Sequence, residues 1–191
     1  MSITTPAAGG SIDATWGQGV ATFVNGRTAI TANVAGITTT QVQVVALTVA
    51  ANTFIAGATY RVRGFGTITS TAANACTFRV RIGTTTLTGN IPATVAPTAT
   101  TTASAHSFEV EGIVTIRSTG ASGSAIGGMS ARGTGPGTAQ PFTDSHRVGT
   151  STATVTVDTT VQNILELTAV AAAGTTTINF YVATIELMSA P

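Results

Sequence analysis

Hydrophobic and polar residues alternate along several short stretches of this chain. The clearest is 60–65, Tyr-Arg-Val-Arg-Gly-Phe, and the same period of two recurs over 77–87 and 108–116. Such alternation is typical of a strand with one buried and one exposed face. Weaker alternation predicts further strands at 20–24, 27–30, 38–49, 151–157, 164–170 and 177–187.

Turn signals separate these stretches. Asn25-Gly26 is the strongest short hairpin signal in the chain and is expected to join 20–24 to 27–30. Asn52 and Gly57 mark a turn between two further strands. The last two strands are expected to form the arms of a closing hairpin.

Two long segments are predicted to be irregular. Residues 88–105 are rich in Thr and Ala and contain Pro92 and Pro97, so we expect a long loop. Residues 118–137 form the most glycine-rich stretch. We expect them to be mainly loop, with at most one short strand near Met129.

The resulting pattern, about eight strands with no helical periodicity, predicts an all-β protein. Strands at this spacing indicate a sandwich or barrel, and an antiparallel jelly-roll β-sandwich of two four-stranded sheets fits best. Residues 1–19 are small and polar and are expected to be an extended N-terminal arm, whereas 20–191 are expected to be a single jelly-roll domain.

Composition changes the expected character of the surface. The chain has 41 threonines, 31 alanines and no lysine, and only 8% of its residues are charged, for a net charge of +1. Proteins that stay free in solution usually carry charges on roughly a quarter or more of their surface residues. A weakly charged β surface suits a subunit that is packed against neighbours, although a GC-rich genome would equally account for the missing lysine.

Other classes of partner receive no support from the sequence. Nucleic-acid binding requires clustered Lys and Arg, which are lacking. No run approaches the roughly 20 apolar residues of a membrane span, and the first ten residues do not resemble a secretory signal. The expectation is a protein made in a reducing cytoplasm, without nucleic-acid or membrane partners.

Charged residues on the predicted strands are the main candidates for an interface. Alternation places residues i and i+2 on the same face, and the opposite faces here are apolar, so the charges must point outward. Two readings remain open: a solvated outer face, or an Arg–Glu ladder that fixes the orientation of subunits, with Glu166 and Glu186 as further acids. The pairs are Arg61 and Arg63, Arg79 and Arg81, and Glu109 and Glu111.

The chain has one tryptophan, Trp16, and one cysteine, Cys76. Trp16, the lone indole, suits an anchor of the arm on a neighbouring subunit and suits ordinary packing equally well. Cys76 excludes an internal disulfide, and with no histidine close in sequence it is expected to be a buried structural thiol.

No catalytic chemistry is expected. Asp144, Ser145 and His146 are adjacent, so their side chains cannot reach relay geometry. Glu109 and Glu111 lie on one face and cannot flank a sugar from two sides. Neither histidine has metal-ligand spacing with Cys76. We therefore expect no enzyme activity, cofactor or metal.

Two stretches carry a resemblance to a known family. Residues 47–66 (LTVAANTFIAGATYRVRGFG) lead into 78–85 (FRVRIGTT), and the last predicted strand includes 179–187 (NFYVATIEL). Over residues 38–187 the chain resembles the jelly-roll structural proteins of tailed bacteriophages, which serve as capsid decoration (cement) proteins or as tail and fibre domains.

The resemblance implies a virion structural protein without catalytic residues. The first expectation is a homotrimeric decoration protein on the capsid exterior, which binds the major capsid protein and stabilises the head shell. The alternative is a tail or fibre receptor-binding module that recognises host surface carbohydrate. A hydrolase of cell-wall sugars is a third hypothesis, which lacks a cleft with two opposed carboxylates.

Overall fold

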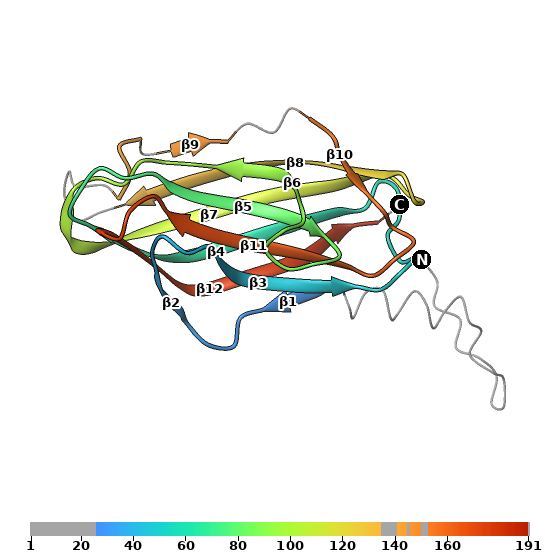
Figure 1. Ribbon diagram of the computed structural model, residues 1–191, viewed down its shortest axis with the longest axis horizontal. Helices are drawn as coiled ribbons and strands as arrows, with labels where there is room; N and C mark the ends of the chain where they lie inside the picture. The colour runs from blue at the N-terminus through green and yellow to red at the C-terminus, as the bar shows by residue number, and fades with distance from the viewer. Residues whose placement is uncertain (1–25, 135–140, 145, 150–152, 191) are drawn as a thin grey trace, which may run out of the picture.

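The computed structural model describes residues 26–134, 141–144, 146–149 and 153–190, and these form an all-β sandwich of two antiparallel sheets (Figure 1). The strands are β1 (Arg27–Ala29), β2 (Val34–Ile37), β3 (Val42–Val49), β4 (Thr59–Ser70), β5 (Cys76–Gly83), β6 (Asn90–Val95), β7 (Thr102–Ser118), β8 (Gly123–Thr134), β9 (His146–Val148), β10 (Val155–Val157), β11 (Asn163–Ala171) and β12 (Thr176–Ser189).

Eight of these strands follow the jelly-roll order. The large sheet contains β1-β12-β4-β7 and the small sheet is β3-β11-β5-β6. The pairs are nested along the chain, from the outermost strands to the innermost: β1 with β12, β3 with β11, β4 with β7 and β5 with β6. The predicted jelly roll is confirmed. The described chain has 12 strands rather than about eight, because β8, β9 and β10 extend the large sheet and β2 adds a second segment against β12.

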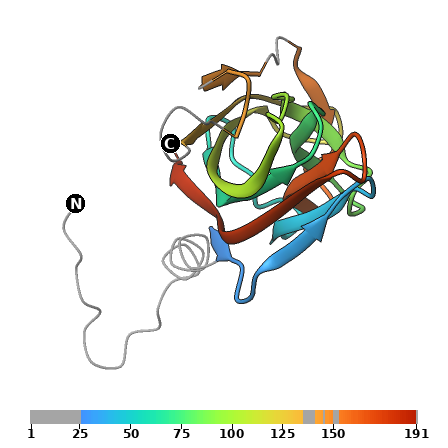
Figure 2. The same cartoon turned by 90° about the vertical axis from the view of Figure 1, so that its left-hand side faces the viewer.

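Alternating burial along the strands explains why the two sheets pack. Every second residue of β5 is buried, and β4 follows almost the same pattern. Four phenylalanines from the two sheets and a connecting segment meet in the core, with ring centroids 5.1–6.4 Å apart: Phe78, Phe108, Phe142 and Phe180. In the end-on view of Figure 2 the sheets curve around this core.

The expectation of two long loops was wrong. Residues 90–95 form β6, which includes Pro92 but lies at the edge of the small sheet, where a missing N–H is tolerated. The glycine-rich stretch contains the 12-residue strand β8. Its glycines admit close neighbours: a Cβ on Gly127 would lie 2.7 Å from the carbonyl oxygen of Ile113.

The expected closing hairpin was also wrong. Strand β11 belongs to the small sheet and β12 to the large one, so the turn between them crosses from one layer to the other. The turn at Asn52 and Gly57 is confirmed, since both have positive φ, 59° and 90°. The predicted strand 20–24, the arm 1–19 and Trp16 lie outside the described residues.

Candidate interaction surface

The outer face of the large sheet collects most of the charged residues that the sequence singled out. In β4 the side chains of Tyr60 and Val62 are buried in the core, so those of Arg61 and Arg63 point outward. Strand pairing sets Arg61 between Glu186 of β12 and Ile113 of β7. The face therefore runs across β12, β4, β7 and β8.

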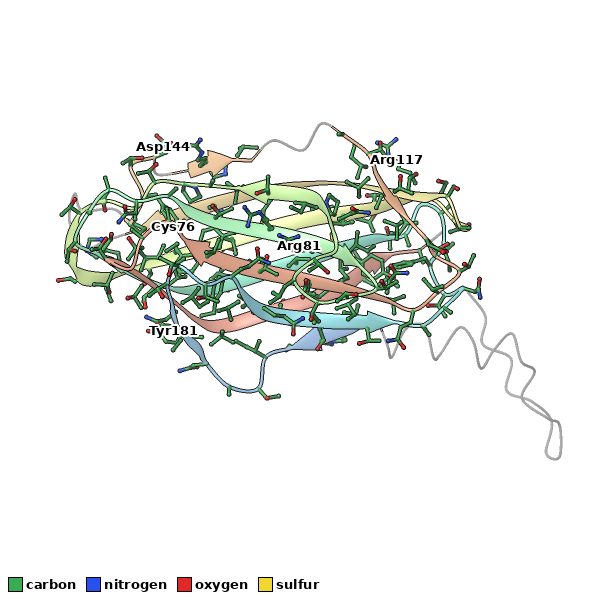
Figure 3. All side chains as sticks on the ribbon, viewed as in Figure 1. Cys76, Arg81, Arg117, Asp144 and Tyr181 are labelled. Atoms are coloured by element: carbon green, nitrogen blue, oxygen red, sulfur yellow. The ribbon has the colours of Figure 1, made fainter. Side chains whose placement is uncertain are left out.

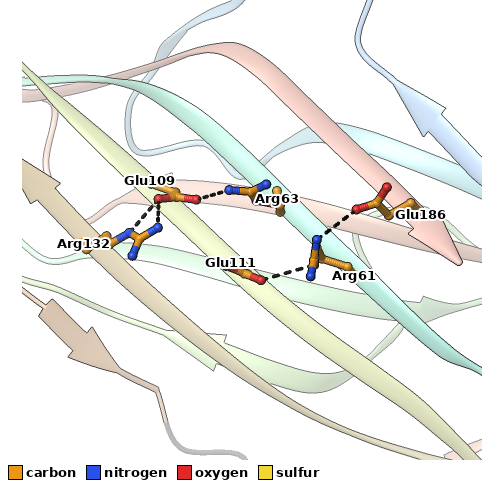
Figure 4. Close-up of polar contacts among 6 residues, drawn as sticks. All are labelled: Arg61, Arg63, Glu109, Glu111, Arg132 and Glu186. Carbon is orange, nitrogen blue, oxygen red and sulfur yellow. Dashed lines mark hydrogen bonds and ion pairs between the residues drawn. The ribbon is translucent and has the colours of Figure 1, made fainter. Parts of the chain in front are cut away.

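Ion pairs join these strands into a ladder (Figure 4). Arg63 Nη2 lies 2.7 Å from Glu109 Oε1, and Arg132 Nε donates to Glu109 Oε2 at 2.6 Å. Arg61 Nε lies 3.3 Å from Glu111 Oε1, and its Nη1 lies 3.5 Å from Glu186 Oε1. The three arginines and three glutamates compensate one another within a single chain.

The ladder contacts between β4 and β7 are diagonal, whereas Arg61–Glu186 and Arg132–Glu109 join residues directly opposite each other. Strand pairing sets Arg63 opposite Glu111, but its guanidinium bonds Glu109, two residues along β7. Arg61 is likewise opposite Ile113 and pairs with Glu111. Diagonal neighbours on a sheet are within reach of long side chains. The same offset at both arginines gives the ladder one consistent direction.

Glu109 is the centre of the ladder. Its side chain is only 12% exposed. Burial raises the pKa of its carboxyl, but the hydrogen bonds from Arg63 and Arg132 outweigh burial, and the pKa lies below the ordinary value. The pKa of Arg63 is raised, chiefly by its hydrogen bond to Glu109. Both groups are therefore charged at neutral pH.

Exposed apolar side chains accompany the ladder. Phe65, Tyr181 and Val182 are 38%, 48% and 50% exposed, and Ile113 and Met188 are also exposed. Tyr181 and Val182 are consecutive yet both exposed, because the pairing with β4 shifts between Phe180 and Val182.

This apolar patch is held in place by neighbouring polar groups. The hydroxyl of Tyr181 lies 2.9 Å from Thr67 Oγ1. The guanidinium of Arg63 lies 5.1 Å from the centroid of the Phe65 ring. Figure 3 shows Tyr181 beside β2, on the surface of the sandwich. Tyr181 and Phe65 thus each have a polar contact within the chain.

The structure places Arg79 and Arg81 elsewhere, on the outer face of the small sheet. Gln41 Oε1 accepts hydrogen bonds from both guanidinium groups, at 3.2 Å from Arg79 and 3.0 Å from Arg81. Glu166, suggested as an acid for the ladder, is 1% exposed; it accepts instead from Gln43 Nε2 at 2.5 Å and the Leu87 amide at 2.6 Å. Of the two acids suggested as additions, Glu186 joins the ladder and Glu166 does not.

The outer face of the large sheet also includes two residues that the sequence did not single out: Arg132 in the ladder and Phe65 in the apolar patch. Arg132 lies in the segment expected to be loop, so the sequence did not predict that it would lie on a strand face. Phe65 carried a readable signal, because it continues the outward alternation of Arg61 and Arg63.

A shallow groove of about 380 Å³ separates the two sheets at one edge, between residues 28–34 and β3 residues 43–46. Its lining is threonine, alanine, valine and isoleucine with Asn33 and Gln43. These side chains supply no acid or base. The groove therefore offers packing space rather than a reaction centre.

The other candidate chemistry is not assembled in the part of the chain that the structure describes. Arginines engage both Glu109 and Glu111. Asp144 pairs with Arg147 at 3.4 Å, and Ser145 lies outside the described residues. Within the described ranges, no three His, Cys, Asp or Glu side chains gather to hold a metal, and no helix there is long and apolar enough to cross a membrane.

Neither a family model nor a curated protein matches the sequence. Among solved structures, the CBM2 module of the evolved Dit of Lactobacillus casei BL23 phage J-1 is similar at 12% identity and a TM-score of 0.33, over 76% of this chain and 70% of that one. The T13 IBDV viral particle is similar at 14% identity and a TM-score of 0.27, over 86% of this chain and 40% of that one. The VP2 subviral particle of infectious bursal disease virus gives 16% identity and a TM-score of 0.23, over 86% and 42%. These low values assign the chain to no family.

Proposed function

We propose that the protein is a virion structural protein: a decoration protein on the exterior of a tailed-bacteriophage capsid. In this proposal it assembles as a homotrimer, binds the major capsid protein and stabilises the head shell. The role is one of binding, and none of its residues is assigned a catalytic function.

The observation that carries the proposal is the outer face of the large sheet. Its strands β4 and β12 run for 12 and 14 residues. At about 4.8 Å between strands and about 3.3 Å per residue, four strands of this length cover about 800 Å². One partner contributes about that area to a standard protein interface.

The chemistry of this face also suits a contact between subunits. Its charges are paired within the chain, so a neighbour need not supply counter-charges for the ladder. Its exposed residues include Phe65 and Tyr181, and aromatic residues are enriched in interface cores. Exposed apolar patches on an otherwise threonine-covered surface mark sites of association.

Light scattering of the purified protein tests the assembly. The proposal predicts a native mass three times the 19.0 kDa of one chain. Saturable binding to undecorated phage heads, with greater resistance of the heads to heat, would then support the decoration role. A stable monomer that does not bind heads would contradict it.

The second candidate is a tail or fibre module that recognises surface carbohydrate, and one observation favours it. Two aromatic side chains, Phe65 and Tyr181, lie on the surface rather than in the core, and exposed aromatic faces with nearby hydroxyls can stack on sugar rings. A glycan array distinguishes the candidates. Binding that Tyr181→Ala abolishes would favour the tail module, whereas no glycan binding would count against it.

A further inference from the structure

The arginines on the outer faces of the two sheets differ in their ion pairing. On the large sheet every ladder arginine has a carboxylate within 4 Å. On the small sheet no carboxylate of the described chain lies within ion-pair distance of Arg79 or Arg81, because Glu166 is engaged by Gln43 and Leu87. Glu166 lies opposite Arg81 in the strand pairing and attracts it, but among the described residues neither β5 arginine makes an ion pair, whereas all three ladder arginines do.

Arg79 and Arg81 are held close to each other. They alternate with the core residues Phe78, Val80 and Ile82 on β5, so both point to the same outer face. The shared acceptor, Gln41 Oε1, links the two guanidinium groups. Arg81 Nη1 also donates to the carbonyl of Gly89 at 2.9 Å, which ties it to the β5–β6 loop. Figure 3 labels Arg81 near the middle of the small sheet.

Burial makes this arrangement costly. Both side chains are half-buried, and two like charges near each other repel. Burial and the neighbouring Arg79 lower the pKa of Arg81, while Glu166 raises it. Arg27 and Arg117 also have no ion pair in the described chain, but they are exposed and water solvates them. Only the pair on β5 gains much from an added anion.

Donors remain available for such an anion. Of the five N–H groups of the Arg79 guanidinium, only one on Nη1 makes a hydrogen bond within the described chain. Arg81 Nη1 and Nη2 each donate one described hydrogen bond, to Gly89 and to Gln41, and each carries a second N–H. A planar guanidinium fork matches a carboxylate in bidentate geometry. The site therefore has the donors and the charge for one or two carboxylates.

We propose that Arg79, Arg81 and Gln41 form a docking site for an acidic segment of a partner protein on the outer face of the small sheet. Nucleic acid is the less suitable anion, because its backbone calls for many cations and the whole chain has a net charge of +1. That the partner belongs to the virion rests on the proposed function, whereas the acid-binding chemistry does not. The large sheet then serves contacts between copies, and the small sheet serves the partner.

Fluorescence anisotropy with a fluorescein-labelled hexaglutamate peptide tests this site in the full-length protein. The wild type is expected to bind at low ionic strength and to release the peptide as salt screens the charges. Arg79→Gln combined with Arg81→Gln is expected to weaken binding roughly tenfold, from the loss of two partly exposed ion pairs. The matched control, Arg27→Gln with Arg117→Gln, removes the same charge elsewhere and is expected to bind within about twofold of the wild type.

Several results would overturn the proposal. These are a wild type that does not bind the peptide, equal binding by wild type and the β5 double variant, and an equal loss in both double variants. Arg79→Gln alone, which removes one described hydrogen bond, keeps the test valid if the double variant does not fold. An oligonucleotide that binds more tightly than the peptide and depends on the same two arginines would assign the site to nucleic acid instead.

The outcome is separable from the proposed function. Peptide binding by a protein that is monomeric and ignores phage heads would retain the site and remove the decoration role. A trimer that binds heads but not the peptide would do the reverse.

Discussion

Cys76 is fully buried at the start of β5. Burial raises the pKa of its thiol to about 12, against an ordinary 9.0, although a backbone hydrogen bond from Ala99 opposes the rise. Because the thiolate is the reactive form, a shift of this size lowers its population near pH 8 by about a thousandfold.

We therefore expect the folded protein not to react with a thiol reagent such as DTNB at pH 8. In denaturant one thiol per chain should react at once. Prompt labelling of the folded protein, at a rate near that of a free thiol, would show that Cys76 is accessible.

Glu109 makes the stability of the protein depend on pH. Its folded-state pKa is lowered from the ordinary value of 4.5, so its contribution is present above that value and is lost as the pH falls through the folded-state pKa. We expect Glu109→Gln to lower the free energy of unfolding by about 1–2 kcal/mol at pH 7. The difference from wild type should shrink below about pH 4.5.

Urea denaturation across this pH range measures the effect. Glu186→Gln is the matched control, because Glu186 is 41% exposed and its one ion pair is 3.5 Å long. It should cost less than about 1 kcal/mol at any pH. A Glu109→Gln deficit that stays constant with pH would mean that the ion pairs do not cause it.

Sequence reasoning at this scale identified which residues share a face but not which of them meet. Period-two alternation put Arg61 with Arg63 and Glu109 with Glu111, and the structure agrees. The same alternation holds for Arg79 and Arg81, which lie on the other sheet. Their partners depend on strand order and register, which a local pattern does not contain.

At the scale of elements, Gly66 shows how the β4–β12 pairing depends on one missing side chain. A Cβ at Gly66 would lie 1.8 Å from the carbonyl oxygen of Asn179, and backbone cannot turn away as a side chain can. The β12 irregularity that exposes Tyr181 and Val182 begins at Phe180, the partner of Gly66. Gly66→Ala must therefore push these strands apart.

We expect Gly66→Ala to destabilise the protein by roughly 1–3 kcal/mol, the range for overpacking a dense interior. Gly128→Ala on β8 is the control, since a Cβ there meets no atom within 4 Å; it should change stability by less than about 0.5 kcal/mol. Chemical denaturation compares the two. Equal stabilities would mean that β4 and β12 can separate slightly at no cost.

Strands with a clear apolar face were predicted well, and strands without one were missed. β4 and β5 alternate strongly and were found. β8 contains four glycines among its 12 residues and little apolar patterning, yet it pairs along most of β7. Its pairing comes from the backbone of its neighbour, so its own residues carry only a weak strand signal.

At the scale of the whole molecule, the sequence indicated the jelly roll but assigned the final strands to one hairpin. The two final strands were predicted correctly, as β11 and β12, but their placement in one sheet was wrong. Strands β11 and β12 are consecutive in the sequence but lie in different sheets. β11 pairs with β3 and β5 in the small sheet, and β12 pairs with β1 and β4 in the large sheet. The choice is made by long-range pairing, which local turn signals do not record.

The proposed assembly makes a prediction for the outer face of the large sheet. Val182 is 50% exposed there, beside Phe65 across the strand pair. A charge buried without a partner in an interface is strongly unfavourable, so Val182→Glu should give a monomer in light scattering. The Val182 side chain faces solvent in a single chain. The substitution therefore removes no core packing and should not in itself lower the melting temperature of the monomer.

Val148 provides the control, since it is 67% exposed on β9, at the side of the large sheet away from β12. Val148→Glu introduces the same charge and should leave the native mass at three chains. If both variants remain trimers, the subunits meet through another surface. If both become monomers, the added negative charge alone is responsible. The result would then give no support for a subunit contact through the face across β12 and β4.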